Sequence, residues 1–413
     1  MTMTFDAASE RPQFWRLPEV RRSPRFFRSA LDVTADNWRG APLTVALPSG
    51  HALRIHGEGV GPGVRLDIRD FNFIRRILAS GDIGFAEGFV EGDWDTPDLA
   101  GLLVAFSENF DRLGEVMRGN PLVRVADYLS HALRNNSRAG SKKNIHAHYD
   151  LGNGFYGAWL DPSMTYSAAI FDEARTSLEQ AQGAKYRALS QSIGIESGHN
   201  VLEIGCGWGG FAEFVGREIG ARVEAVTISK AQHDYAAARI QAAGLSERVK
   251  IRLCDYRDVQ GKFDRVASIE MFEAVGEAYW PTFFARVQDL LKPGGLAGLQ
   301  VITIADHLFD GYRRRPDFIQ KYIFPGGMLP SDQRLREETR AAGLAWLSCT
   351  GFASDYARTL GLWASRFQEA WPDIEALGFD ERFRRLWLYY LGYCEAGFAT
   401  GRTDVVHLTL KRA

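Results

Sequence analysis

The second half of the chain alternates short apolar runs with segments of helical spacing, and this alternation constrains the fold more than any other feature. Strand and helix in alternation indicate right-handed crossovers between parallel strands. We therefore predict an α/β fold built on a doubly wound, mainly parallel sheet of seven strands. The seven predicted strands are 201–204, 222–228, 249–254, 263–269, 295–304, 344–349 and 404–412.

The first 110 residues follow a different pattern. Residues 42–70 show strand-like alternation around the turn-rich GEGVGPG, and the stretch after them changes to helical spacing. Residues 111–145 combine helical pieces with the polar, basic stretch NNSRAGSKKN, which is typical of a linker. We predict a smaller α+β domain over 1–110, a basic helical linker over 111–145 and the large α/β domain over 146–413.

The composition indicates a globular protein of the cytoplasm. The 24% charged and 46% apolar residues are ordinary for such a protein, and a net charge of −2 argues against a nucleic-acid partner. No run of about 18 apolar residues exists, and the N-terminus lacks the apolar core of a secretory signal. The four cysteines form no CxxC pair, so we expect no metal site.

Residues 11–28 carry six arginines interleaved with aromatic residues, against a single acid, Glu19. Cations beside rings suit a segment that rests on an anionic lipid surface. We predict peripheral contact with the inner face of the membrane, with a solvated arm as the alternative.

The stretch VLEIGCGWGG, residues 201–210, joins the first strand of the sheet to its helix. Gly205, Gly207 and Gly209 allow the backbone to come close to a ligand at the carboxyl end of the strand. A tight turn would also need glycine. Glu203, just before the glycines, would bring an acid close to a positively charged ligand.

The next two strands discriminate between ligands. A nicotinamide dinucleotide site expects an acid about 20 residues after the glycines, whereas this chain offers Thr227, Ser229 and Gln232. Asp255, after the third strand, is placed to accept a bond from an adenine amino group. These residues favour a methyl donor over a hydride carrier, and a nicotinamide dehydrogenase remains the rival hypothesis.

Further motifs narrow the class. They are HAHYDLGNGFYGAWLDPSMTYSAAIF (146–171), MFEAVGEAYW (271–280), LKPGGL (291–296), KYIFPGGMLPS (321–331) and YLGYCEAGF (390–398). With the glycine turn, they make residues 144–412 similar to cyclopropane-fatty-acyl-phospholipid synthases and mycolic acid methyltransferases. These belong to the class I S-adenosylmethionine-dependent methyltransferases, which have a Rossmann-like sheet.

This resemblance implies a cofactor, a substrate and a set of site residues. The cofactor would be S-adenosylmethionine, the base a bound bicarbonate, and the substrate an unsaturated acyl chain of a phospholipid; a homodimer is left open. Glu273 and Tyr356 would hold the bicarbonate. The cofactor pocket would be lined by Tyr166, Ser167, Gly205, Gly207, Thr227, Gln232 and Tyr256.

The chain departs from the family at three positions. Ala168 stands where the synthases usually have cysteine, Ala274 stands where histidine is common, and Gln300 replaces a histidine on the fifth strand. An amide can donate to an anion but cannot titrate near pH 7. Glu273, Tyr356 and Gln300 are therefore the catalytic candidates that decide the product.

Three outcomes are left open. The first is a cyclopropane, and the second is a ring-free product, either a methylene- or methyl-branched chain or a furan fatty acid precursor. The third is an inactive lipid-binding homologue. In the first two, aromatic faces would stabilise the carbocation by roughly 0.5 to 2 kcal/mol each. The candidates are Tyr166, Phe171, Tyr322, Phe324 and Trp363.

Overall fold

The computed structural model describes residues 3–4, 18–57, 63–114, 119–120, 151–172 and 177–413. Most of the predicted linker and the first residues of the arginine-rich segment, 11–17, lie outside the described residues. The chain divides into two compact units. The smaller unit comprises Met1–Ser130, Arg315–Lys321 and Gly378–Thr400, and the larger comprises His131–Arg314, Tyr322–Leu377 and Gly401–Ala413. The domain limits drawn from the sequence remain a prediction.

The smaller unit packs helices on a five-stranded sheet with the order β1-β3-β2-β4-β5. Its strands are β1 (Met3–Thr4), β2 (Leu43–Ala46), β3 (Ala52–Ile55), β4 (Val64–Ile68) and β5 (Trp94–Asp95). Its helices are α2 (Pro18–Arg22), α3 (Arg25–Asn37), α4 (Asn72–Ser80), α5 (Asp82–Val90), α6 (Leu99–Asn109) and α19 (Glu381–Ala399). Although α19 is remote in sequence, Arg385 ties it to this unit by donating to the Trp94 carbonyl oxygen at 3.0 Å.

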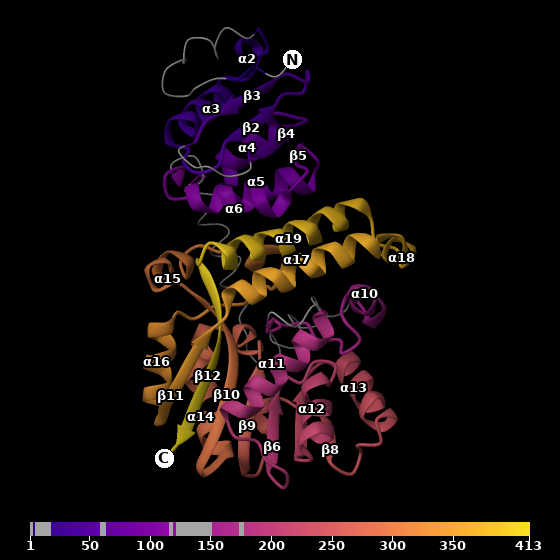
Figure 1. Ribbon diagram of the computed structural model, residues 1–413. Coiled ribbons are helices and arrows are strands. Elements are labelled where there is room, and N and C mark those ends of the chain that lie inside the picture. Colours follow the sequence, from indigo (N-terminus) through magenta and orange to yellow (C-terminus); the bar gives the residue numbers. More distant parts are fainter. Residues whose placement is uncertain (1–2, 5–17, 58–62, 115–118, 121–150, 173–176) are drawn as a thin grey trace. The chain divides into compact units, whose positions relative to one another are not determined.

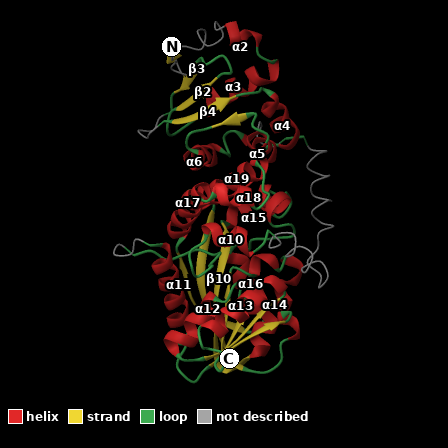
Figure 2. Cartoon of the chain, turned by 90° about the vertical axis from the view of Figure 1, so that its right-hand side faces the viewer, coloured by secondary structure: helices red, strands yellow, loops and turns green. Residues whose placement is uncertain are grey.

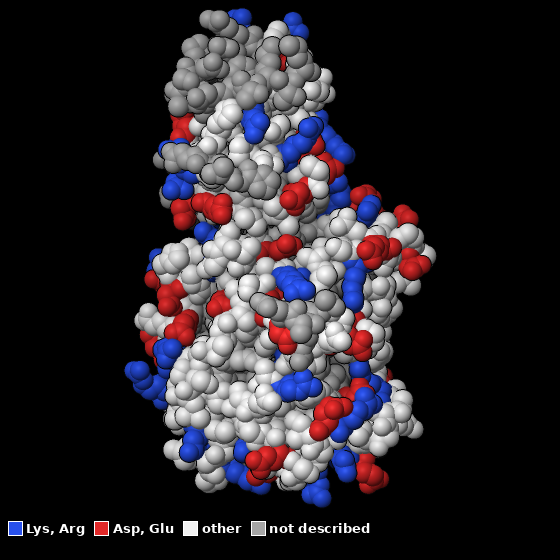
Figure 3. Space-filling model, viewed as in Figure 1, with Lys and Arg blue, Asp and Glu red and all other residues white. Residues whose placement is uncertain are grey.

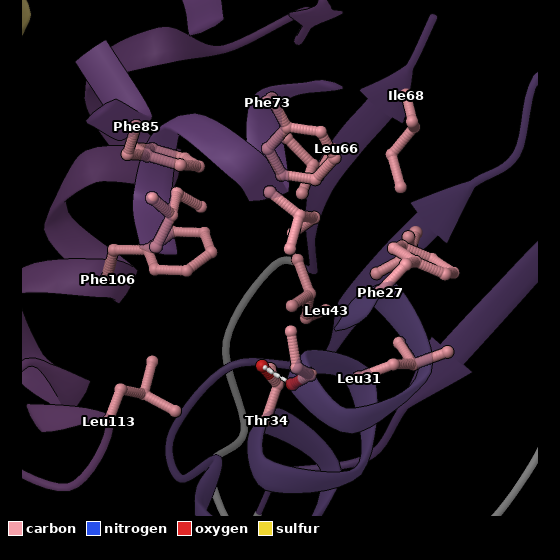
Figure 4. A pocket seen from close by; sticks show the side chains of 14 residues that line it. Phe27, Leu31, Thr34, Leu43, Leu66, Ile68, Phe73, Phe85, Phe106 and Leu113 are labelled. Atoms are coloured by element: carbon pink, nitrogen blue, oxygen red, sulfur yellow. Dashed lines mark hydrogen bonds between the residues drawn. The ribbon is translucent and has the colours of Figure 1, made fainter. Parts of the chain in front are cut away.

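A small cavity lies in the core of this unit (Figure 4). It measures about 60 Å³, and its lining is apolar apart from Thr34, whose hydroxyl donates to the Ala30 carbonyl oxygen at 2.8 Å. This volume equals roughly two water molecules in the liquid. Because its lining is almost entirely apolar, the cavity is a poor site for ordered water.

The larger unit contains a seven-stranded sheet with the order β11-β12-β10-β9-β6-β7-β8. All seven strands predicted from the sequence are present, and only β12 runs antiparallel to its neighbours, β10 and β11. The fold class is thereby confirmed. The strands are β6 (Asn200–Ile204), β7 (Arg222–Thr227), β8 (Val249–Leu253), β9 (Phe263–Ile269), β10 (Leu291–Ile304), β11 (Leu344–Gly351) and β12 (Thr403–Arg412).

Helices cover both faces of this sheet (Figure 2). Because side chains alternate along a strand, Val201 of β6 packs with α11 and α12, whereas Leu202 and Ile204 pack in the core beside α14. The helices are α10 (Asn153–Trp159), α11 (Leu178–Ser192), α12 (Gly210–Phe214), α13 (Lys230–Ala242), α14 (Trp280–Leu290), α15 (Asp306–Tyr312), α16 (Asp332–Ala341), α17 (Ala353–Glu369) and α18 (Trp371–Ala376).

Helix α17 lies across the carboxyl ends of the parallel strands (Figure 1). In open α/β sheets this edge is where ligands bind. Tyr356, one of the site residues predicted from the sequence, belongs to α17 itself and is buried. Among the described helices, none is long and apolar enough to cross a membrane.

Candidate active site

The glycine turn after β6 leaves space for a ligand. Gly205 has φ +82° and Gly207 has φ +50°, both in the left-handed region. A Cβ atom on Gly205 would lie 2.5 Å from Cγ of Met271, whereas a Cβ atom on Gly207 would meet nothing within 4 Å. Gly205 is therefore required by packing, and Gly207 faces open space at the strand end.

Glu203 lies in β6 beneath this space. It is only 2% exposed, and its Oε2 atom has no hydrogen-bond partner in the described chain. Burial raises the pKa of Glu203 to about 8, opposed by the positive charge of Lys185. A buried carboxylate oxygen without a donor suits a cationic group of a ligand, because unpaired buried charge is costly.

The second strand ends in a polar network that the sequence identified. Thr227 Oγ1 donates to Gln232 Oε1 at 2.9 Å, and Ser229 Oγ caps α13 by accepting from the Gln232 amide at 3.3 Å. Asp255, after β8, accepts two bonds from Arg257, at 2.8 and 2.6 Å. Its predicted contact with adenine remains a prediction.

Tyr256 and Ser167 also hold defined positions. The Tyr256 ring packs edge-on against Phe283, with centroids 5.5 Å apart. Ser167 Oγ accepts a hydrogen bond of 2.7 Å from Nζ of Lys185, a fully buried lysine of α11. Burial lowers the pKa of Lys185 to about 7.

The centre of the site is a carboxylate that the sequence did not single out. Glu270 directly follows β9 and has φ +47°, a left-handed conformation that is uncommon for a residue with a side chain. Its Oε1 atom accepts from the Ala168 amide at 2.8 Å and from Gln300 Nε2 at 2.7 Å. Its Oε2 atom accepts from the Tyr356 hydroxyl at 2.7 Å. Three donors from distant segments thus converge on one carboxylate.

Two opposing sets of effects act on the pKa of Glu270. Burial raises its pKa above the ordinary value, while the bonds from Tyr356, the Ala168 amide and Gln300, together with the charge of Lys185, oppose that rise. Each oxygen of a carboxylate has room for about two donors. Since Oε2 has one described donor, it retains capacity to take a proton.

Glu273 lies at the same sheet edge as Glu270, and its role as an anion holder remains a prediction. The resemblance grouped Glu273 with Tyr356 as the anion holder, but the structure brings Tyr356 and Gln300 together around Glu270. Glu273 Oε1 instead accepts from the Ile302 amide at 2.5 Å, and its buried Oε2 has no partner within the described residues. Burial, reinforced by the charge of Glu270, raises the pKa of Glu273 to about 8.

A sequence signal for Glu270 did exist. The rule that singled out Asp255, an acid directly after a buried strand, applies equally to Glu270 in SIEMFEAVG. The family motif drew attention to Glu273 three residues later. The geometry shows that both acids lie at the same sheet edge.

Aromatic rings enclose the side of the site beside Tyr356. The Trp363 ring centroid lies 5.3 Å from that of Tyr166 and 6.1 Å from that of Tyr356, and Trp159 lies 5.7 Å from Trp363. Of the five predicted aromatic candidates, Tyr166 and Trp363 therefore lie together. Phe171 instead packs under the Arg358 guanidinium, 4.2 Å from its ring centroid. The positions predicted for Tyr322 and Phe324 remain predictions.

These features fit one ligand chemistry. The glycine turn provides space at the carboxyl end of β6, Glu203 offers an unpartnered carboxylate oxygen, and the β7 end is polar without an acid. In the described chain no group of three or more His, Cys, Asp or Glu residues could hold a metal ion. Fold and site together define a class I S-adenosylmethionine-dependent methyltransferase.

The particular family follows from comparison with known proteins. Residues 136–408 match the family model of mycolic acid cyclopropane synthetase, and the chain belongs to this family. It is 41% identical over 347 residues to the tuberculostearic acid methyltransferase of Mycobacterium tuberculosis, covering 82% of this chain and 81% of that protein. It is 34% identical over 372 residues to the cyclopropane-fatty-acyl-phospholipid synthase of Escherichia coli K12, covering 89% and 92%.

A solved structure supports the same family assignment. The mycolic acid cyclopropane synthase CmaA1, crystallised with S-adenosylhomocysteine, superposes with a TM-score of 0.62 at 30% identity. The match covers 66% of this chain and 98% of that one. The protein is therefore an S-adenosylmethionine-dependent methyltransferase that acts on fatty acyl lipids.

Proposed function

We propose that this protein methylates the double bond of unsaturated acyl chains in membrane phospholipids and releases a ring-free, branched product, with Glu270 as the base. The observation that carries this proposal is the position of the Glu270 carboxylate. It receives the Ala168 amide, the Gln300 amide and the Tyr356 hydroxyl, all within 2.8 Å. By resemblance, Tyr356 would have held bicarbonate, and Gln300 stands in place of the family histidine.

Glu270 leaves bicarbonate without a binding place beside Tyr356. The donors there are already engaged by a carboxylate of the chain itself. A second anion 4 Å from that carboxylate would be repelled by about 4 kcal/mol at an effective dielectric constant of about 20. The base is thus built into the protein, and we expect the reaction to need no bicarbonate.

The chemistry assigns separate tasks to the residues. S-adenosylmethionine, when bound, supplies an electrophilic methyl group. An alkene is a weak nucleophile, so the rate depends on its alignment in a dry site, and the buried Trp363 helps to exclude water. After methylation, the other alkene carbon is cationic, and the Tyr166 and Trp363 rings are placed to stabilise it by roughly 0.5 to 2 kcal/mol each.

The fate of the cation decides the product. If a C–H bond of the new methyl group breaks first, its electron pair closes a three-membered ring. If a hydride first moves from the methylated carbon to its cationic neighbour, the charge becomes tertiary. Loss of a methyl proton to Glu270 then turns the C–H electron pair into the double bond of a methylene (C=CH₂) branch. Both routes release one proton and need no further reactant.

The hydrogen bonds to Glu270 favour the second route. Donors to a carboxylate stabilise its charged form and weaken it as a base. Three such donors delay proton removal, which lengthens the life of the cation and gives the hydride time to move. The 41% identity with a tuberculostearic acid methyltransferase, a protein named for a branched product, supports this outcome.

Cyclopropane formation is the second candidate. It is supported by the 34% identity with a cyclopropane-fatty-acyl-phospholipid synthase over most of both chains. That name also supports a phospholipid as the substrate. The buried carboxylates, with raised pKa values, argue against an inactive homologue, because strongly perturbed pKa values cluster at functional sites.

The test uses the purified protein with S-adenosylmethionine and vesicles of monounsaturated phospholipid. Both candidate products gain one CH₂, so mass alone cannot separate them. Nuclear magnetic resonance of the released fatty acids distinguishes the alkene protons of a methylene branch from cyclopropane ring protons. Ring protons, or a rate that depends on added bicarbonate, would refute the assigned role of Glu270, and no methyl incorporation would refute the proposed function.

We further propose that the smaller unit contacts the anionic membrane through Arg21, Arg22 and Arg25. All three are exposed and form no ion pair within the described residues. The neighbouring Phe26 lies under Arg75, 5.4 Å from its guanidinium. On the face shown in Figure 3, by contrast, basic and acidic side chains are interspersed over the described residues of each unit.

Vesicle sedimentation tests this contact. Each cation near an anionic surface contributes about 1 kcal/mol, so replacing the three arginines with glutamine is expected to weaken binding on the order of 100-fold. The matched control replaces three exposed, unpaired arginines of the larger unit, Arg187, Arg222 and Arg248. Equal losses in the two triple variants, or equal binding to neutral vesicles, would contradict the assignment of this surface.

A further inference from the structure

Gln300 and His407 stand directly opposite each other on the antiparallel strands β10 and β12. Opposed residues in an antiparallel pair project from the same face of the sheet. His407 Nε2 lies 2.9 Å from Gln300 Oε1. The imidazole is 7% exposed, and its ring packs edge-on against Phe352 with centroids 4.9 Å apart.

The surroundings of Gln300 determine how its amide is oriented. Its Nε2 atom faces two acceptors, Glu270 Oε1 at 2.7 Å and the Ala168 carbonyl oxygen at 3.3 Å. Its Oε1 atom must therefore face His407. Because an amide oxygen only accepts, His407 Nε2 must carry the hydrogen. The reversed amide would place its oxygen against Glu270 Oε1 and the Ala168 carbonyl oxygen, with no hydrogen between the facing oxygen atoms.

The charge state of His407 supports this assignment. Burial lowers the pKa of His407 to about 3, and the positive charge of Lys185 acts in the same direction. Gln300 and Phe352, which contact the ring, are uncharged. A neutral imidazole has a single N–H group, so the donor at Nε2 persists over the working pH range.

We propose that His407 is a positioning residue for the base: its Nε2–H bond directs the Gln300 amide onto Glu270 and thereby holds the carboxylate in its proton-accepting place. This inference rests on the proposed function, because it takes Glu270 as the base. His407 acts only through Gln300. By resemblance, the family carries a histidine at the position of Gln300. In this chain an imidazole is supplied instead by His407, from the neighbouring strand β12.

Three single variants test the role of His407. His407→Leu removes the donor, and His407→Gln keeps an N–H group at a similar reach. Thr409→Val is the matched control, because Thr409 lies two residues along the same strand and its buried hydroxyl has no partner in the described chain. The measurements are kcat against pH, the KM for S-adenosylmethionine and the melting temperature.

We expect His407→Leu to shift the acid limb of the kcat profile, which is the pH range in which kcat falls because the base becomes protonated. Without a directed Gln300 amide, Glu270 loses a donor that favours its charged form, so its pKa rises and the acid limb moves up by about one pH unit. At pH values within that limb, kcat falls about tenfold, while KM changes less than twofold. In His407→Gln and Thr409→Val, the acid limb of kcat is expected to lie at the same pH as in the wild type. If His407→Leu does not fold, His407→Phe takes its place.

A double-variant cycle with Gln300→Leu completes the test. Since His407 acts through Gln300, adding His407→Leu to Gln300→Leu is expected to change kcat less than twofold. Additive losses, or an acid limb unmoved by His407→Leu, would overturn the inference. If the wild type itself transfers no methyl group, the proposed function fails instead, so the two failures are distinguishable.

Discussion

Replacing Glu270 with glutamine separates the base from the structure around it. The amide has the size of the carboxylate and can keep the surrounding bonds. Its oxygen can accept from the Ala168 amide and Gln300, as Oε1 does now, while the Tyr356 hydroxyl can turn to accept from the new NH₂ group. Three charge-assisted bonds become neutral, but the buried charge disappears as well. We therefore expect the free energy of unfolding to change by no more than about 1 kcal/mol.

The loss of activity is expected to be much larger. An amide cannot take a proton, and a positioned general base contributes about 10² to 10⁴ in rate. The assay is incorporation of labelled methyl into vesicles, with affinity for S-adenosylhomocysteine measured by calorimetry. Glu270→Gln should lose at least about 100-fold in kcat while affinity stays within about threefold. A kcat within about threefold of the wild type would refute the assignment of Glu270 as base.

Glu270→Gly provides a second arm of the same experiment. Glycine accepts φ +47° without strain, and the three donors then face a space of carboxylate size. Added bicarbonate or formate is expected to restore part of the activity. An equal stimulation of Glu270→Gln, which leaves no such space, would contradict this explanation.

Three further predictions follow from the site. Gly205→Ala places a Cβ atom 2.5 Å from Met271 Cγ at φ +82°, so it should lower the free energy of unfolding by about 1 to 3 kcal/mol in urea titrations and weaken cofactor binding. Lys185→Met removes a charge that lowers the pKa of Glu203 and Glu270, so the acid limb of kcat should move to higher pH. The pKa of Glu273 rises on folding from 4.5 to about 8, so the folded state binds the extra proton, and stability of the ligand-free protein should fall as pH rises from about 4.5 to 8. Glu273→Gln should flatten that slope, and an unchanged slope would contradict the raised pKa.

The architecture of the larger unit was predictable because its signals are local. Each strand is a short apolar run, and the burial that defines it is visible in consecutive residues, as in Val201, Leu202 and Ile204. The glycine turn was equally visible, because left-handed backbone at Gly205 and Gly207 requires glycine at those positions themselves. The polar residues Thr227 and Gln232 in place of an acid after β7, together with Asp255 after β8, favoured a methyl donor.

The base was not predictable in this way. Glu270 is defined by donors from Ala168, Gln300 and Tyr356, which lie 102, 30 and 86 residues away along the chain. Its place directly after β9 marks it as an acid at the sheet edge, but nothing in the local sequence shows which donors its carboxylate meets. Only the packing of α17 and the Ala168 loop over the strand ends brings these donors to one carboxylate and not to the other.

By itself, then, the sequence determined the class of fold, the place of the cofactor turn and the kind of chemistry, since apolar periodicity and glycine conformation are properties of neighbouring residues. The tertiary structure decided which acid is the base and which groups orient it. Strand register places His407 opposite Gln300, although the two are 107 residues apart in the sequence. A hydrogen bond between residues so far apart depends on the tertiary structure, and no local sequence pattern encodes it.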